Sequence, residues 1–344
     1  MSLSNEEVLK AFGNDYESAV PFSVWHHFNP DEHVEAREDP TIFKNDVAKE
    51  PQFVDAVDPD FIKLMDDGYF TYQFQNVSDP NDLASLKKIT EISTDHPWLV
   101  DQKQLFEDQL SSLNQNKVIL SNVFSAVSLF KWSLVRGLPS TELALGDKRF
   151  ADLYTKDPDT VIHALRVINQ DIKKQIEVGH QAGVNGVFFS TQEIQDDRID
   201  EHFFEKVQKP LDAELIETIN QDFDIGVLHI CGFDGATNHL PWFVDYSLPV
   251  VNWATKVDGY TLGEGKQLFK DKVVFGGLGN TTNDVLFSGT QAEIQSAVDR
   301  VLDESGTTGV IIGSDCTVPR KTPVENIRWA AEAAHTYQDR KQND

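Results

Sequence analysis

Short apolar runs recur along the whole chain, and each is closed by a polar or glycine-containing segment. Runs of this length that are apolar or rich in β-branched residues predict β-strands. We predict eight strands, and segment 69–75 is an alternative to the second of them. The eight segments are 20–28, 60–66, 117–125, 184–190, 224–232, 249–255, 273–279 and 308–315.

Amphipathic helical patterns lie between these strands. In segment 159–183 apolar residues recur at helical spacing, and Gly183 provides a stop signal. Segment 290–305 begins with Thr290 as its predicted N-cap and has Glu293 as the capping-box partner. Strands and helices therefore alternate to the end of the sequence.

This alternation predicts the fold class. The strands within 273–279 and 308–315 are continuously apolar, which is typical of parallel strands covered on both faces. Eight such units predict an α/β fold, a (β/α)8 TIM barrel with an N-terminal helical extension and a long segment between the third and fourth strands. An open doubly wound sheet is the alternative, but no GxGxxG phosphate turn follows the first strand.

Composition limits the number of domains and the class of partner. No repeat, low-complexity tract or Gly/Ser linker divides the 344 residues, so we expect one barrel domain over 1–344. Lys and Arg number 30 against 56 Asp and Glu, and the net charge of −26 disfavours nucleic acid and anionic membranes as partners. The N-terminus lacks the features of a signal peptide, and no run approaches a membrane span. We therefore expect a cytoplasmic protein, monomeric or homodimeric, with a small-molecule substrate.

The two cysteines of the chain both fall at predicted strand ends, where a barrel gathers its functional groups. His229 and Cys231 close the fifth strand and point to the same face, because they are two positions apart. Cys316 follows the eighth strand. One imidazole and two thiolates are typical of a catalytic zinc site with an open fourth position. The alternative is that both cysteines are small buried hydrophobic residues and that His229 is a hydrogen-bonded core residue.

The same residues carry a family resemblance. The HICG sequence at 229–232, with Cys316 far downstream, resembles the HxC…C zinc motif of the corrinoid-linked methyltransferases that pass a methyl group to coenzyme M. Those enzymes belong to the uroporphyrinogen decarboxylase superfamily of (β/α)8 barrels. Four further segments resemble this superfamily: 20–25, 250–253, 276–280 and 311–335. The resemblance implies zinc as a cofactor, a corrinoid as a methyl donor and a corrinoid protein as a partner.

Departures from the decarboxylases decide between the functions found in this superfamily. Those enzymes have an Arg-rich segment after the first strand, whereas 25–33 contains no Arg here. The Asp that those enzymes have at strand six is replaced in this chain by Asn252. Their Gly-His-Gly at strand eight is replaced by segment 313–316, which reads GSDC. An acidic chain without local positive charge suits a substrate with eight carboxylates poorly.

We therefore expect a zinc-dependent methyltransferase that holds a thiol acceptor as a thiolate and methylates it from a corrinoid or related donor. The first alternative is uroporphyrinogen decarboxylase, which converts uroporphyrinogen III to coproporphyrinogen III in porphyrin biosynthesis. The second is a non-catalytic barrel that binds a small molecule or a corrinoid.

Further candidates lie at the ends of the early strands. His26 and His27 face opposite ways if the strand continues, so at most one of them points into the barrel. Lys63 in an apolar strand requires an acid partner, for which we expect Asp66. Asp66 also resembles the catalytic aspartate of the decarboxylases, and Gln73 competes with it if the alternative second strand forms.

The later strands add more polar groups. Glu193, next to Gln192, is predicted as a fourth zinc ligand or an acid, with a helix N-terminal acid as the alternative. Asn252 is predicted to orient a substrate, Trp253 to wall the pocket and Asp315 to orient a metal ligand. The predicted catalytic residues are Asp66, His27 and Glu193. The predicted substrate-binding residues are Trp25, His26, Lys63, Gln192, Asn252, Trp253 and Asp315.

Overall fold

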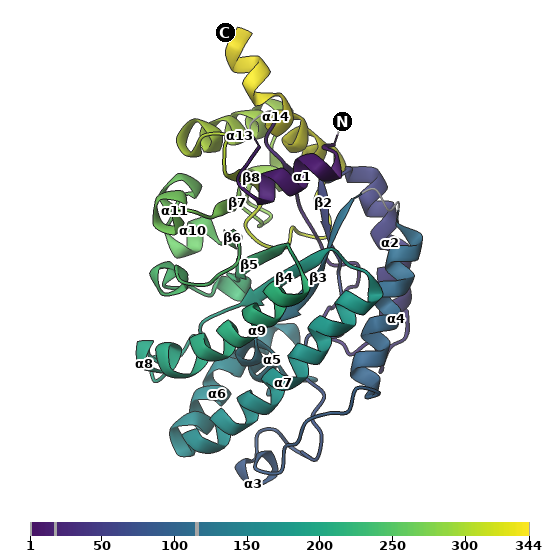
Figure 1. The fold of residues 1–344 in the computed structure, drawn as a ribbon, viewed down its shortest axis with the longest axis vertical. Coiled ribbons are helices and arrows are strands. Elements are labelled where there is room, and N and C mark those ends of the chain that lie inside the picture. Colours follow the sequence, from purple (N-terminus) through teal and green to yellow (C-terminus); the bar gives the residue numbers. More distant parts are fainter. Residues whose placement is uncertain (1, 17–18, 114–116, 344) are drawn as a thin grey trace.

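The computed structural model describes residues 2–16, 19–113 and 117–343. Eight parallel strands form one sheet in the order β1-β8-β7-β6-β5-β4-β3-β2, which curves into a nearly closed barrel inside a layer of helices (Figure 1). The predicted (β/α)8 TIM barrel is therefore confirmed. The strands are β1 (Phe22–Ser23), β2 (Phe61–Lys63), β3 (Val118–Phe124), β4 (Gly186–Thr191), β5 (Gly226–Ile230), β6 (Val250–Trp253), β7 (Val273–Leu278) and β8 (Val310–Ser314).

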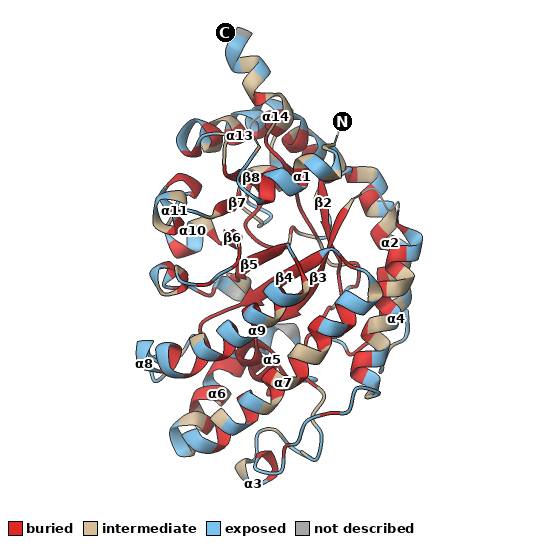
Figure 2. Cartoon of the chain, viewed as in Figure 1, coloured by how far each residue is buried: buried red, intermediate tan, exposed pale blue. Residues whose placement is uncertain are grey.

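The helices cover the outside of the strands. Figure 2 shows the strands as buried, whereas the helices are buried on one side and exposed on the other. In the described ranges no helix is long and apolar enough to cross a membrane. The α-helices are α1 (Asn5–Phe12), α2 (Thr41–Val57), α3 (Leu83–Leu86), α4 (Pro97–Ser112), α5 (Ala126–Ser133), α6 (Leu145–Lys156), α7 (Pro158–Ala182), α8 (Glu201–Phe203), α9 (Lys209–Asp222), α10 (Thr255–Asp258), α11 (Leu262–Phe269), α12 (Val285–Ser288), α13 (Gln291–Ser305) and α14 (Val324–Asn343).

Local sequence signals explain the limits of the long helices. Helix α7 ends at Gly183, whose φ of +96° is a left-handed conformation that glycine adopts without strain. Helix α13 starts after Thr290, and Thr290 and Glu293 form the predicted capping box. The second strand forms within 60–66 and not within 69–75, where the pairing shown is one isolated bridge to Thr90.

The barrel has a seam between β1 and β2, because these strands form no ladder with each other. Asp60 spans the seam: its N–H donates to the Phe22 carbonyl at 2.9 Å, and its Oδ2 accepts from the Phe22 N–H at 2.7 Å. Its Oδ1 accepts from the Leu3 N–H at 2.6 Å, and its Oδ2 also contacts Nε2 of His335 in α14 at 2.8 Å. One fully buried carboxylate therefore joins the N-terminal segment, both seam strands and the last helix.

Apolar side chains fill the inside of the barrel. Trp25, Phe61, Phe188 and Phe275 belong to this inner cluster. The Trp25 ring lies 4.9 Å from the Phe188 ring and 5.8 Å from the Phe275 ring, measured between centroids. The interior is thus a packed floor, and polar groups at the C-terminal ends of the strands lie above it.

Candidate metal centre

His229, Cys231 and Cys316 converge above this floor. His229 lies in β5, Cys231 follows the end of β5, and Cys316 lies just beyond β8. Their possible ligand atoms all lie within 4.8 Å of one another, and the Cys316 Sγ is 3.6 Å from the His229 Nε2. All three side chains are buried, with 3%, 6% and 6% of their surface exposed. The two-residue spacing on β5 and the curvature of the barrel therefore produce the triad that the sequence predicted.

Asn252 fixes the orientation of the His229 ring. The two residues are register partners on β5 and β6, and the Asn252 Oδ1 lies 2.5 Å from the His229 Nδ1. The Asn252 Nδ2 donates to the carbonyls of Phe275 at 2.9 Å and Ser314 at 3.2 Å. Because these two bonds point the amide nitrogen away, Oδ1 faces His229 as an acceptor and Nδ1 carries the proton. The Nε2 lone pair is therefore directed at the sulfur atoms, as in metal-binding histidines.

The two thiols interact with each other. The hydrogen bond between them raises the pKa of Cys231, to which burial adds, and lowers the pKa of Cys316, which also interacts with His229. Two sulfurs and one imidazole nitrogen, buried and preoriented, fit a zinc ion with three protein ligands.

Hydrogen bonds to the backbone hold the Cys231 segment in place. The Gln192 Nε2 donates to the carbonyls of Cys231 at 2.9 Å and Phe233 at 3.1 Å, while its Oε1 accepts from Lys131. The Asn238 Nδ2 donates to the same Cys231 carbonyl at 3.2 Å. Gln192, predicted as a substrate ligand, thus contacts the backbone of a predicted metal ligand.

Asp315 braces the strand ends beside Cys316. Its Oδ2 accepts from the N–H of Thr255 at 3.1 Å and from its hydroxyl at 2.5 Å, and its Oδ1 accepts from the Gly277 N–H at 2.9 Å. Burial raises its pKa to about 6. The carboxylate therefore ties the ends of β6, β7 and β8 together, and Asp315 is not among the residues that line the pocket above the triad.

Replacing Asn252 with alanine should weaken zinc binding by roughly 10- to 100-fold, because His229 loses the partner that orients it. Competition with a chromogenic chelator measures the change. Asn220→Ala is the matched control, since Asn220 is exposed and contacts Ser247 on the outside of the barrel. Equal zinc affinity in both variants would show that the Asn252 contact does not support the site.

A pocket opens above the triad, with about 400 Å³ of empty space counted to its mouth. Only about 30 Å³ of this space is accessible to a water-sized sphere, well below the roughly 300–1,000 Å³ of typical small-molecule sites. One side is aromatic, and the rest is polar. The lining residues besides the triad are His27, Glu32, His33, Lys63, Phe70, Phe124, Trp132, Ser190, Phe233 and Thr317.

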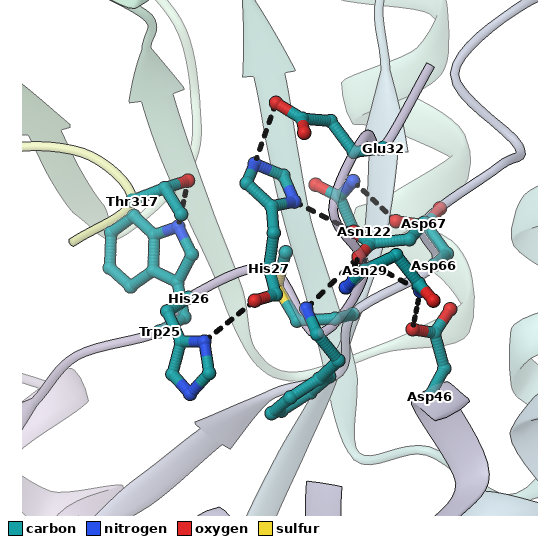
Figure 3. A network of polar contacts seen from close by, with 12 residues as sticks. Trp25, His26, His27, Asn29, Glu32, Asp46, Asp66, Asp67, Asn122 and Thr317 are labelled. Atoms are coloured by element: carbon teal, nitrogen blue, oxygen red, sulfur yellow. Dashed lines mark hydrogen bonds and ion pairs between the residues drawn. The ribbon is translucent and has the colours of Figure 1, made fainter. Parts of the chain in front are cut away.

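His27 is the member of the histidine pair that lines the pocket (Figure 3). Its Nδ1 lies 2.6 Å from the Asp67 Oδ1, and its Nε2 lies 3.5 Å from the Glu32 Oε1. Burial alone would raise the pKa of Asp67, but hydrogen bonds from His27 and Asn29 hold it below its usual value. An ionised carboxylate therefore orients the His27 ring, an arrangement suited to proton transfer.

His26 and Asp66 occupy different positions from those expected. The His26 ring lies apart from the His27 ring in Figure 3, with its Nδ1 2.7 Å from the His27 carbonyl oxygen, and it contacts Phe53, with 4.4 Å between ring centroids. The Asp66 Oδ1 accepts from the Asn122 Nδ2 at 2.9 Å, and burial raises its pKa to about 7. His27 thus bonds to Asp67, and Asp66 reaches the pocket only through Asn122 and Ser190, whose side chains are 3.2 Å apart.

The expected ion pair between Lys63 and Asp66 is not formed in the described part of the chain. The Lys63 ammonium instead lies over the rings of Trp25 and Phe188, 5.1 and 4.9 Å from their centroids. Trp25, which was predicted to bind substrate, packs inside the barrel and is not among the lining residues; its Nε1 donates to the hydroxyl of the lining residue Thr317 at 3.0 Å.

Trp253 and Glu193 also lie in positions other than those predicted. Trp253 points outward from β6, because its neighbour Asn252 points inward; its Nε1 donates to the Tyr260 carbonyl at 3.0 Å. Glu193 binds His239 through both oxygens, at 2.5 Å to the backbone N–H and 2.9 Å to Nδ1, and lies outside the triad. It also precedes α8 by several residues, so it is no helix N-terminal acid.

Several pocket residues were not predicted from the sequence. Glu32 and His33 lie in the loop after β1, where barrels carry functional groups, and the Glu32 carboxylate pairs with Arg320 from the loop after β8. Both ring nitrogens of His33 lack a hydrogen-bond partner within the described ranges. The end of a predicted strand indicates where such a loop begins, but it does not indicate that these side chains point into the pocket. The unpredicted lining residues are Glu32, His33, Phe70, Phe124, Trp132, Ser190, Phe233 and Thr317.

Comparison with solved structures gives the same fold in other proteins. A methyltransferase from Methanosarcina mazei matches with a TM-score of 0.72 and 14% identity over 97% of this chain and 98% of that one. A protein from Listeria monocytogenes titled as a vitamin-B12 independent methionine synthase matches with a TM-score of 0.53 and 14% identity, over 92% and 98%. A B12-independent methionine synthase from Shewanella sp. W3-18-1 matches with a TM-score of 0.50 and 12% identity, over 94% of this chain and 99% of that one.

Sequence comparison identifies the family. No curated protein sequence matches the chain. The family described as uroporphyrinogen decarboxylase (URO-D) matches residues 67–337, a range that includes the triad and most of the barrel. This chain therefore belongs to the uroporphyrinogen decarboxylase (URO-D) family.

Proposed function

We propose that this protein is a zinc-dependent methyltransferase that activates a thiol acceptor for methyl transfer from a corrinoid or a related donor. The observation that carries the proposal is the buried His229, Cys231 and Cys316 triad at the base of an open pocket. A zinc ion with these three ligands would have one open position, in which it could hold a thiol as a nucleophilic thiolate near neutral pH. The similar structures of a methyltransferase and of a B12-independent methionine synthase support the reaction class.

The protein's own residues have distinct tasks in this reaction. Asn252 keeps the Nε2 of His229 free, and Gln192 holds the backbone at Cys231. The aromatic side of the pocket limits access of water to the sulfur. His27, held by Asp67, can accept or donate a proton beside the acceptor. A corrinoid donor would approach from the open mouth, presented by a partner protein.

The pocket chemistry favours methyl transfer over uroporphyrinogen decarboxylation. Among the described residues that line the pocket, Lys63 is the only Lys or Arg, and Arg320 is already paired with Glu32. Eight substrate carboxylates would lack counter-charges in such a site. The decarboxylase reaction and a binding protein without turnover are therefore the alternatives to the proposed methyl transfer.

Elemental analysis and a methyl-transfer assay test the proposal together. We expect about one zinc per chain and methylation of 2-mercaptoethanesulfonate by methylcobalamin, lost on chelation and restored by zinc. Uroporphyrinogen is the comparison substrate. Protein that contains no zinc after growth in zinc-supplemented medium, or that decarboxylates uroporphyrinogen after chelation, would contradict the proposed function.

A further inference from the structure

Lys63 is a buried lysine that lines the same pocket as the triad. It is the last residue of β2, and only 6% of its surface is exposed. Its ammonium lies over the Trp25 and Phe188 rings. The His229 ring contacts the same two rings, at centroid distances of 5.9 and 5.2 Å. Lys63 and His229 therefore pack against the same two rings, and both line the pocket.

The described structure provides no acid in ion-pair contact with this ammonium. Burial lowers the pKa of Lys63, while the charges of Asp66, Cys316 and Cys231 act in the opposite direction. Asp66 makes no direct contact with the ammonium, because its Oδ1 accepts from Asn122 and its Oδ2 has no hydrogen-bond partner in the described ranges. A buried lysine without a paired acid is costly, which indicates that its partner arrives with the reaction.

The charges of the proposed site identify that partner. A zinc ion with two thiolates and a neutral imidazole has no net charge. An acceptor thiolate adds one negative charge inside a buried pocket, where an uncompensated charge is strongly disfavoured. The ammonium of Lys63 is the one Lys or Arg charge that lines this pocket in the described chain.

We propose that Lys63 is a catalytic residue whose ammonium is the counter-charge of the acceptor thiolate, an inference that rests on the proposed function. The S–H bond of the acceptor breaks, the sulfur keeps the electron pair, and the proton leaves to solvent while Lys63 keeps its own protons. Because the ammonium packs on the same two rings as the predicted metal ligand His229, contact with the reacting sulfur is favoured over contact with a charged tail of the acceptor.

Thiol binding to the cobalt-substituted protein tests this role without relying on turnover. The sulfur-to-cobalt absorption band reports thiolate binding as pH is varied, with 2-mercaptoethanol as a neutral thiol and 2-mercaptoethanesulfonate as an anionic one. We expect Lys63→Met to raise the midpoint pH of binding by about one to two units, equally for both thiols. Lys63→Arg should restore most of the shift, and cobalt content should remain near one per chain.

The control is Lys87→Met, which removes the same charge from an exposed ion pair with Asp157. A midpoint in Lys63→Met equal to that of the control would overturn the proposal, and so would a shift confined to the anionic thiol, which would indicate tail binding. If Lys63→Met does not fold, two other variants decide. A wild-type midpoint in the neutral variant Lys63→Gln would overturn the proposal, and so would a folded Lys63→Arg whose midpoint differs from that of the wild type. Wild-type protein that binds cobalt but no thiol would instead contradict the proposed function.

Discussion

Replacing Cys316 by serine should abolish stoichiometric zinc and reduce thiol methylation by more than the roughly 100-fold expected for loss of an outer-shell partner. Cys316 supplies one of the three convergent ligand atoms, and its loss leaves one sulfur and one imidazole nitrogen, too few for a tight zinc site. A serine hydroxyl is a far poorer ligand for zinc at neutral pH, because it remains protonated. Elemental analysis of the purified variant and a methyl-transfer assay at saturating zinc measure the two effects.

Ser314→Ala is the matched control for this experiment. Ser314 lies two positions before Cys316, and its hydroxyl has no hydrogen-bond partner in the described part of the chain. Removing the hydroxyl should therefore change neither zinc content nor folding. Cys231→Ser should behave as Cys316→Ser does. Full zinc occupancy in either cysteine variant, with circular dichroism like that of the wild type, would refute the assignment of the triad.

Replacing Asp60 by asparagine should lower the free energy of unfolding by about 2–4 kcal/mol, since its two oxygens accept three hydrogen bonds in a buried position. An asparagine has one oxygen, so its amide nitrogen must face the N–H of Leu3 or the donors Phe22 and His335. At least one buried donor then loses its acceptor. Urea unfolding followed by circular dichroism measures the loss.

Asp58→Asn provides the comparison at a nearby carboxylate. Asp58 is largely exposed and forms a 2.6 Å ion pair with Lys117, a contact typically worth less than about 1 kcal/mol. Its left-handed φ of +53° is also compatible with asparagine. If the two variants unfold at the same urea concentration, the seam does not depend on Asp60 as we expect.

Strand prediction from sequence succeeded best where the sheet is continuous. The apolar runs of β7 and β8 lie between strands on both sides, so burial on both faces determines their composition. The first and second strands are much shorter than the predicted 20–28 and 60–66, because they border the seam and each has only one ladder partner. An apolar run records burial, but it does not show whether a neighbouring strand is present.

The site was predictable where strand alternation holds and not beyond it. His229 and Cys231 share a face by their spacing, and the same rule places Trp253 outside once Asn252 is inside. Asp66 and Asp67 follow β2 in a loop, where alternation no longer indicates which carboxylate reaches His27. Side-chain direction in such loops is set by tertiary hydrogen bonds that a local pattern does not contain.

The position of the triad also implies that a bound metal ion would stabilise the fold. Cys231 and Cys316 are 85 positions apart in the chain, and β6 and β7 lie between their strands. A metal ion would act as a reversible cross-link that closes this long loop, with an entropic benefit on the order of 4 kcal/mol in the chain-entropy treatment. The metal-free protein should accordingly lose hydrogen-exchange protection first in β5 to β8, so that its C-terminal half becomes a separate cooperative unit.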